Sequence, residues 1–112
     1  MSFALTTPQM RARTKTVTRR NGWCHLKPGE RLIAIEKGQG LKKGERQVVI
    51  GEIEVVSVRR EPLTAITPDD VKREGFPDRT VKDFVLGYMG ANRGTYIHSD
   101  VTRIEFRHVE AT

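Results

Sequence analysis

Four stretches of the chain show the residue patterns of β-strands. β-Branched residues at alternate positions predict an extended strand over residues 14–19. Residues 31–36 carry apolar side chains on both faces, which indicates a strand at the centre of a sheet. Residues 47–59 give the longest strand pattern, and its alternation slips after Val55, as it does at a β-bulge or barrel corner. Residues 101–109 alternate apolar and charged positions and should form the last strand.

Three short helices are predicted between these strands. A threonine followed by proline favours a helix over residues 8 to about 13. A second helix, over residues 68–74, begins with a capping threonine, a proline and two acids, and Gly75 closes it. A third begins near residue 80 and ends at Gly90. Its apolar stripe at helical spacing consists of Val81, Phe84, Val85 and Tyr88.

These elements together predict the fold class. The helices are too short to cross over a large parallel sheet, so the strands should be mostly antiparallel. We expect an α+β fold that is mainly β, namely a small barrel or highly curved sheet with two or three short peripheral helices. One such domain would cover residues 1–112, with a mobile, basic, glycine-containing loop at residues 38–44.

Composition adds a preference for a partner and a compartment. The net charge of +6 and the pI near 9.9 make nucleic acid the first partner to consider, because clustered cations gain free energy from counterion release on phosphate chains. Cys24 is the only cysteine, which excludes an internal disulfide and fits a reducing compartment. The N-terminus lacks the apolar core of a signal peptide, and no apolar run approaches the ~20 residues of a membrane span. We therefore expect a cytoplasmic protein without a membrane association, and favour a monomer.

The chemically densest stretch runs over residues 11–20, where cations and threonines follow one another and no acid interrupts them. Its cations are Arg11, Arg13, Lys15, Arg19 and Arg20. A solvated basic strand is the simplest interpretation of such a run. The alternative is a cationic, hydroxyl-rich pocket for an anionic or polar ligand.

The order of three sequence blocks resembles the ASCH domain of the PUA-like superfamily. The blocks are basic-Lys-Thr-x-Thr-x-Arg, then Lys-Pro-Gly-Glu, then Ile-Thr-Pro-Asp-Asp-Val with Glu-Gly-Phe closing the helix. The resemblance implies a small β-barrel, a cleft between barrel and helices, and a link to RNA binding. Lys15 and Arg20 match the general signature, whereas Arg13 stands in place of its glycine and Thr18 in place of its acid.

The threonine version is similar to a bacterial branch whose members resemble amidohydrolases acting on N4-acetylcytidine. The lysine, threonine and glutamate that act in that branch correspond to Lys15, Thr18 and Glu74. The sequence as a whole also resembles ASCH proteins carried by phages of actinobacteria, for which no reaction is generally assigned.

Elementary chemistry is compatible with such a site under one geometric condition. Like charge on Arg11, Arg13, Arg19 and Arg20 should lower the pKa of Lys15 and so make a neutral amine available as a base. In an ideal strand, however, Lys15 and Thr18 point to opposite faces, so a shared site requires a turn or kink at Lys15. A carboxylate in the last turn of a helix, such as Glu74, faces the negative end of the helix dipole and needs a compensating cation.

Other candidates are less specific. Trp23 could stack on a nucleobase or could cover the core. His98 and His108 lie far apart in the sequence without acidic or cysteine companions, so we expect no metal site and no cofactor.

The leading functional hypothesis is RNA or modified-nucleoside binding in a cationic cleft. Lys15, Thr18 and Arg20 would form its floor and Glu74 would face them. The remaining ligand-binding candidates are Arg11, Arg13, Arg19 and Trp23. The alternative is a metal-independent amidohydrolase that uses Lys15, Thr18 and Glu74 on N4-acylated cytidine nucleosides. A ribonuclease is the third choice.

Overall fold

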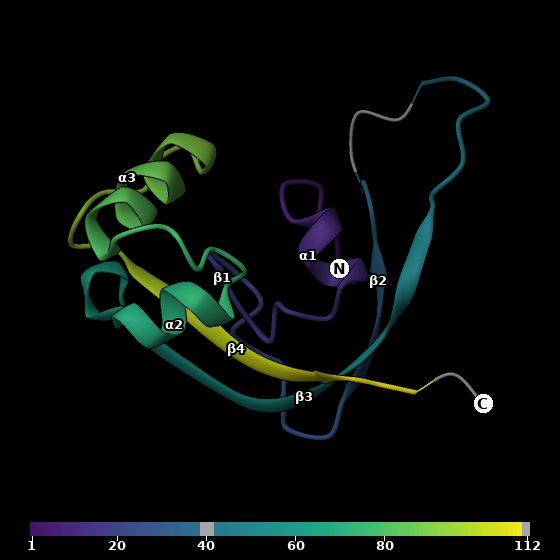
Figure 1. Cartoon of the computed structure of the whole chain (residues 1–112), viewed down its shortest axis with the longest axis horizontal. Coiled ribbons are helices and arrows are strands. Elements are labelled where there is room, and N and C mark those ends of the chain that lie inside the picture. The colour runs from purple at the N-terminus through teal and green to yellow at the C-terminus, as the bar shows by residue number, and fades with distance from the viewer. Residues whose placement is uncertain (39–41, 111–112) are drawn as a thin grey trace.

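A four-stranded antiparallel sheet and three short α-helices make up the computed structural model, which describes residues 1–38 and 42–110 (Figure 1). The strands are β1 (Val17–Arg20), β2 (Arg31–Ile35), β3 (Val49–Pro62) and β4 (Asp100–His108), and their order in the sheet is β1-β4-β3-β2. The helices are α1 (Thr7–Arg11), α2 (Pro68–Arg73) and α3 (Val81–Ala91), with a 3-10 turn over Leu63–Ala65.

The sheet is strongly curved, and the helices lie inside its curve. The long strands β3 and β4 bow together, and α1, α2 and α3 all lie on the concave side (Figure 1). The predicted fold class, α+β and mainly β with a highly curved sheet and short peripheral helices, is confirmed. No helix in the described ranges is long and apolar enough to cross a membrane.

A β-bulge interrupts β3 at the position that the sequence pattern indicated. The pairing register between β3 and β4 shifts between Val55 and Ser57, so Val56 is an extra residue and its side chain is 45% exposed. Bulges bend a strand and increase its twist. This bulge therefore contributes to the curvature that brings the helices and the sheet around a common interior.

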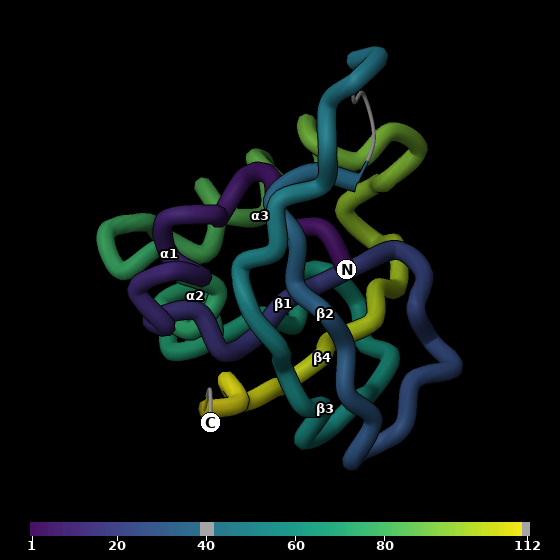
Figure 2. Tube along the Cα trace, turned by 90° about the vertical axis from the view of Figure 1, so that its right-hand side faces the viewer, coloured from purple at the N-terminus to yellow at the C-terminus, as the bar shows by residue number. Residues whose placement is uncertain are grey.

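Strand β2 lies at the edge of the sheet, so its predicted central position was wrong. Its free side is covered by the N-terminal segment, in which Ser2 forms a parallel bridge with Ile35 (Figure 2). The N-terminal ammonium donates to the Ile33 carbonyl at 2.8 Å, and the Phe3 amide donates to the Ile35 carbonyl at 2.9 Å. Ile33 is 51% exposed, so its apolar side chain does not mark a second buried face.

Strand β1 begins at Val17 rather than at residue 14, because the chain turns before it. Arg13 has φ of 61°, in the left-handed region that L-residues seldom occupy. Residues 14–16 follow in irregular conformation, and the Thr16 amide donates to the Arg73 carbonyl of α2 at 2.8 Å. Lys15 therefore lies on an irregular segment ahead of the strand that carries Thr18.

The helices begin where the sequence predicts and end within one or two residues of the expected positions. The side chain of Thr67 accepts a hydrogen bond from the Asp70 amide at 3.2 Å, and that of Thr80 accepts one from the Asp83 amide at 3.1 Å. Helix α1 ends at Arg11, two residues before the expected end, and α3 runs one residue past Gly90. The predicted loop at residues 38–44 lies partly outside the described residues.

Two of the three buried apolar clusters of the described residues contribute side chains to a common cavity. One contains Phe84 and Tyr88 of α3 with Val71 of α2, and the other contains Phe3 and Phe106. Phe3, Phe84 and Tyr88 also line a cavity of about 250 Å³. The cavity therefore lies where the N-terminal segment, α3 and the sheet come together.

Substitution of Gly75 should destabilise the fold more than substitution of another glycine with positive φ. Gly75 has φ of 105°, and an added Cβ would lie 2.8 Å from Cγ and 3.0 Å from Cβ of Gln9 on α1. Gly94 has φ of 78° and open space around it. Both alanine variants introduce backbone strain of about 1–2 kcal/mol, and Gly75→Ala adds a steric overlap of about 1–3 kcal/mol.

Urea unfolding of Gly75→Ala and Gly94→Ala would measure this difference. Equal losses of unfolding free energy would show that α1 does not press on the end of α2 as described.

Candidate functional site

The candidate site is a cavity of about 250 Å³ between the N-terminal segment, β1, the end of α2 and α3. Its charged and polar lining is formed by Thr6, Lys15, Thr18, Arg19, Arg20, Glu74, Arg79 and Asn92. Its aromatic lining is formed by Phe3, Phe76, Phe84 and Tyr88. The lining thus offers a ligand both hydrogen-bonding groups and flat apolar surfaces.

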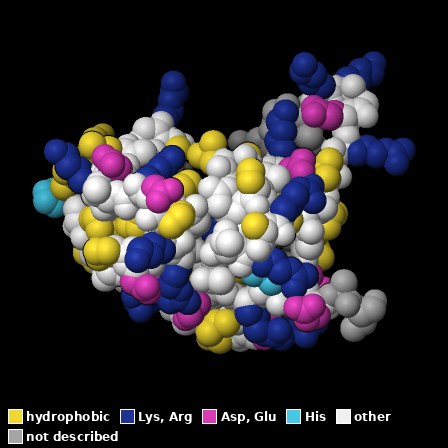
Figure 3. Space-filling model, viewed as in Figure 1, with side chains coloured by type: hydrophobic (Ala, Val, Ile, Leu, Met, Phe, Trp, Pro, Cys, Tyr) yellow, Lys and Arg dark blue, Asp and Glu magenta, His cyan; other side chains and the backbone are white. Residues whose placement is uncertain are grey.

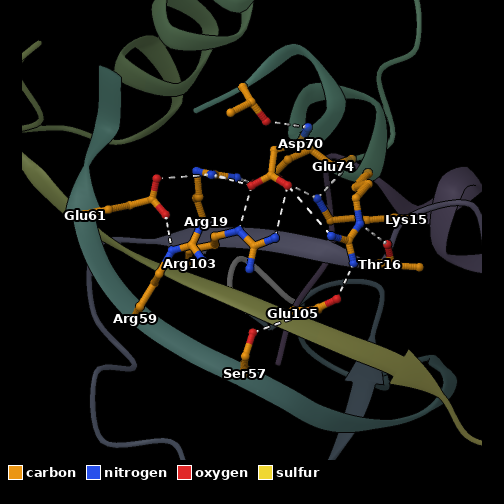
Figure 4. A network of polar contacts seen from close by, with 12 residues as sticks. Lys15, Thr16, Arg19, Ser57, Arg59, Glu61, Asp70, Glu74, Arg103 and Glu105 are labelled. Atoms are coloured by element: carbon orange, nitrogen blue, oxygen red, sulfur yellow. Dashed lines mark hydrogen bonds and ion pairs between the residues drawn. The ribbon is translucent and has the colours of Figure 1, made fainter. Parts of the chain in front are cut away.

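A buried ion pair between Lys15 and Glu74 forms part of the polar wall (Figure 4). Lys15 Nζ donates to Glu74 Oε1 at 2.9 Å and to the Glu74 carbonyl oxygen at 2.8 Å, and both residues are 3% exposed. The backbone of Lys15 is fixed from the sheet side, since His108 Nε2 lies 2.8 Å from its carbonyl oxygen. The ammonium group is therefore held at one place in the cavity wall.

A second cation occupies the other oxygen of Glu74. Arg19 Nη1 donates to Glu74 Oε2 at 3.0 Å, and Arg19 Nη2 donates to Asp70 Oδ2 at 2.7 Å. Arg103 completes the cluster with two hydrogen bonds to the Asp70 carboxylate, at 2.6 and 3.0 Å (Figure 4). Glu61 adds a longer contact to Arg19 at 3.5 Å. The side chain of Arg19 is fully buried, so these carboxylates replace the water that its Nη1 and Nη2 atoms lose, whereas its Nε is buried without a hydrogen-bond partner among the described residues.

Glu74 is the C-cap residue of α2, where the helix dipole disfavours a carboxylate. Lys15 and Arg19 offset this disadvantage with one hydrogen bond to each oxygen. Removing one partner of such a buried group usually costs about 3–5 kcal/mol, because the other charge is left without compensation. The site is therefore part of the structural core as well as a candidate for chemistry.

Thr18 lies in the same cavity without a direct hydrogen bond to Lys15 or Glu74. Its Oγ1 accepts a hydrogen bond from Arg20 Nε at 3.2 Å, and the side chain is nearly inaccessible to solvent. Arg20 also donates from Nη2 to the Ser2 carbonyl at 2.7 Å, and its guanidinium carbon lies 4.8 Å from the ring centre of Phe3. The kink before β1 thus brings Lys15, Thr18 and Glu74 to one cavity, as a shared site requires.

The pKa of Lys15 is lowered, but the main cause differs from the expected one. Burial of the ammonium group contributes most, and Glu74 opposes it by stabilising the charged form. Arg20 and Arg19 lower the pKa further, in agreement with the like-charge argument. Arg11 and Arg13 are not among the causes. Burial also raises the pKa of Tyr88 to about 12, with Glu74 as the next cause, and Tyr88 donates to Asn21 Oδ1 at 2.9 Å.

Three of the sequence-predicted ligand contacts lie outside this cavity. Arg11 pairs with Glu36, and Arg13 pairs with Glu110 at 2.8 Å. Both arginines line a separate cavity of about 170 Å³ instead. Trp23 is 37% exposed, belongs to none of the buried clusters, and stacks on His25 with ring centres 6.2 Å apart. On the face seen in Figure 3, Lys and Arg side chains alternate with acids rather than forming one basic strip.

Several residues of the cavity and of the adjoining charged cluster were not identified from the sequence. Asp70 was interpreted only as an acid of the first helical turn, yet it holds Arg19 and Arg103 together. Arg79 and Asn92 lie in or next to loops and gave no signal, whereas Tyr88 was assigned to the core and lines the cavity as well. Arg103 occupies a charged position of the alternating pattern in the last strand, and it is only 5% exposed. Two sequence features could have revealed this pair, namely an arginine within a strand and an acid at the start of a helix. Together they permit a buried ion pair.

Within the described residues, no three His, Cys, Asp or Glu side chains gather in a way that could hold a metal ion. The acids of the cavity cluster are engaged by Arg19, Arg103 and Lys15. The polar wall therefore offers ammonium, guanidinium, hydroxyl and carboxylate groups for direct contact with a ligand.

Comparison with known proteins establishes the fold class. The chain is a curled antiparallel half-barrel with short helices on its inner side, and this architecture occurs in a solved structure. That structure is the crystal structure of protein EF3133 from Enterococcus faecalis V583, described by the family model DUF984. The TM-score is 0.67 at 13% sequence identity, and the match covers 94% of this chain and 67% of that chain. No family model matches the sequence itself, and no curated protein matches it.

The stability of the protein in acid should depend on Asp70. Burial alone would raise the pKa of Asp70, but hydrogen bonds from Arg103 and Arg19 outweigh this effect and hold the pKa well below its usual range. Because the pKa is depressed in the folded state, the stabilisation is complete above the unfolded value of about 3.9 and is lost as the pH falls toward the folded value. At pH 7, Asp70→Asn should have a lower free energy of unfolding than the wild type. Between about pH 5 and pH 2, the unfolding free energy of the variant should fall less than that of the wild type.

Urea unfolding at a series of pH values measures this dependence. Asp78→Asn is the matched control, since Asp78 is exposed and forms no ion pair with any described residue. A curve for Asp70→Asn that runs parallel to the wild-type curve would show that Asp70 is not held ionised by the two arginines.

Proposed function

We propose that the chain is a PUA-like ASCH domain that binds a single nucleobase or nucleoside in the cavity between β1, α2 and α3. The observation that carries this proposal is that one cavity is lined both by aromatic rings and by charged, hydrogen-bonding groups. A nucleobase needs both, because its faces are flat and apolar while its edges carry donors and acceptors. The order of sequence blocks that resembles the ASCH domain supports the same ligand class.

The aromatic residues in the lining of the cavity suit a planar ligand. Phe76, Phe84 and Tyr88 follow one another with ring centres 6.1 and 6.2 Å apart, which is ordinary packing for aromatic side chains. Stacking of a base on an aromatic ring contributes about 1–3 kcal/mol in proteins that bind single-stranded nucleic acid. The exposed Trp23 is not needed for this contact.

The size of the cavity and the placement of the cations favour one nucleoside over a length of RNA. A volume of about 250 Å³ lies just below the range of ~300–1,000 Å³ that is usual for drug-sized ligands. Lys15 and Arg19 are buried against acids, and Arg11 and Arg13 are paired with acids at the surface. These four cations are poorly placed for a series of backbone phosphates. An RNA would therefore bind by inserting one nucleotide.

Filling the cavity from α3 should weaken nucleoside binding without harm to the fold. Gly87 lines the cavity, and an added Cβ would meet only Arg79 Nη1, at 3.6 Å. Gly90 lies on the same helix outside the cavity, with no atom within 4 Å of an added Cβ. Both leucine variants remove a helical glycine and should stabilise the helix by up to about 1 kcal/mol.

Calorimetric titration with cytidine, uridine, adenosine, guanosine and N4-acetylcytidine would test this proposal. Gly87→Leu should weaken binding of the preferred nucleoside by more than about tenfold, or 1.4 kcal/mol, whereas Gly90→Leu should bind like wild type. Binding that survives Gly87→Leu unchanged would move the ligand to another surface.

A second candidate function, amide hydrolysis on an N4-acylated cytidine, is favoured by the Lys15–Glu74 contact in the cavity that also contains Thr18. In this reaction the neutral Lys15 amine takes the proton of the Thr18 hydroxyl as Oγ1 attacks the acyl carbon. Arg20 donates to Oγ1 and so favours the developing alkoxide. The carbon–nitrogen bond then breaks, and the proton passes through Glu74 to the leaving amine. Water attacks the acyl-threonine in the same way, which releases the carboxylic acid and restores Thr18.

Incubation with N4-acetylcytidine should release cytidine and acetate in equal amounts if this second function holds. Lys15→Met removes the amine and keeps most of the buried volume, and it should lower the rate by about 10²-fold or more. Because burial lowers the pKa of Lys15, the rate should rise with pH through a value below the ordinary ~10.4 as the amine loses its proton. Nucleoside binding without any release of cytidine would leave binding as the function.

A further inference from the structure

The wall of the candidate cavity carries more positive than negative charge. Lys15, Arg19, Arg20 and Arg79 line it, and Glu74 is the one acid among its described lining residues. The hydrogen-bond partners of these cations show which of the positive charges are already compensated.

Two of the cations are compensated by acids of the protein. Lys15 pairs with Glu74, and Arg19 pairs with Glu74 and Asp70 at 3.0 and 2.7 Å. Asp70 in turn is shared with Arg103. With Glu61, whose carboxylate lies 3.5 Å from Arg19, three carboxylates face these three cations.

Arg20 has no acid partner among the described residues. Its Nε donates to the Thr18 hydroxyl and its Nη2 to the Ser2 carbonyl, which are neutral groups, and Nη1 has no hydrogen bond with the described part of the chain. Burial lowers the pKa of Arg20, and the charge of Glu74 opposes this shift without forming an ion pair with the guanidinium. A partly buried guanidinium without a carboxylate costs free energy, and residues that break such a rule are enriched at functional sites.

Arg79 provides a second uncompensated guanidinium near the entrance. It is exposed at the end of the segment between α2 and α3, and none of the described acids forms an ion pair with it. Its guanidinium carbon lies 4.0 Å from the ring centre of Phe76, so an aromatic contact holds it over the cavity. Gly87 leaves room beside Arg79 Nη1, since even a Cβ there would remain 3.6 Å away.

We infer that the cavity takes a ligand with a phosphate group, namely a nucleoside monophosphate rather than a neutral nucleoside, with Arg20 and Arg79 supplying the countercharge. This inference rests on the proposed function, because it adds the charge of the ligand to the nucleoside site. A phosphate monoester carries about −1.5 to −2 at neutral pH, which matches two guanidinium groups without an acid partner among the described residues. Arginine forks also match the geometry of phosphate oxygens better than lysines do.

The test compares each common nucleoside with its own 5′-monophosphate by calorimetric titration at low ionic strength. Wild-type protein should bind the monophosphate of the preferred base at least about tenfold more tightly than the nucleoside, and this ratio should shrink as salt rises. Arg79→Gln should reduce the ratio by about tenfold, whereas Arg79→Lys should retain most of it because the charge remains. Arg46→Gln is the matched control, since Arg46 is exposed and outside the cavity.

The outcomes separate this inference from the proposed function. If the nucleoside binds and Gly87→Leu blocks it, but the monophosphate binds no more tightly, the site stands and the phosphate inference is overturned. The same conclusion follows if Arg79→Gln and Arg46→Gln change the ratio equally. If neither nucleosides nor monophosphates bind, both proposals fail together.

A further pair of ligands distinguishes the sources of the phosphate. Tetranucleotides with and without a 5′-phosphate would be titrated beside the mononucleotides. A strong preference for the phosphorylated tetranucleotide would point to the end of an RNA chain, and binding of mononucleotides alone would point to the free nucleotide. Either preference supports a phosphate subsite. The subsite is overturned if both tetranucleotides bind equally and the monophosphate and its nucleoside also bind with about the same affinity.

Discussion

The carboxylate of Glu74 connects the end of α2 to the chain before and within β1, and the geometry of the cavity depends on this connection. Lys15 binds one oxygen and Arg19 binds the other, from positions that lie 59 and 55 residues away in the sequence. Each of the three charges would be costly to bury alone. Because they satisfy one another, the polar wall of the cavity is a fixed arrangement of charges that exists before any ligand binds.

This arrangement explains why the structural and functional interpretations of the same residues do not exclude each other. A buried ion pair that is removed on one side leaves the other charge uncompensated, so the residues are needed for folding whatever else they do. A preorganised cluster also avoids the free-energy cost of ordering side chains when a ligand arrives. The neighbouring Thr18 and Arg20 have remaining hydrogen-bonding capacity, and they are therefore the groups that can respond to a ligand.

Local sequence patterns were sufficient for the elements whose stability is itself local. The threonine caps of α2 and α3 and the bulge after Val55 follow from side-chain type and spacing within a few residues. The edge position of β2 could not be predicted from local patterns. The backbone of the N-terminal segment covers the free side of the strand, and the apolar side chain of Ile33 points to a face that is not buried. Burial of Arg19 was equally inaccessible, since periodicity treats an arginine as solvent-facing unless its distant partner Asp70 is known.

The basic stretch over residues 11–20 illustrates the difference between charge density and available charge. The left-handed conformation of Arg13 turns the chain, so the cations before the turn lie at the surface with acids while those after it face the interior. Net charge alone would assign all of them to a nucleic-acid surface. The charges available to a ligand are those without a carboxylate partner. Among the described residues of the cavity wall these are Arg20 and Arg79, and Arg79 lies far outside residues 11–20. Recognition of an anion by this fold would therefore depend on a small number of uncompensated guanidinium groups at a cavity rather than on the overall basicity of the chain.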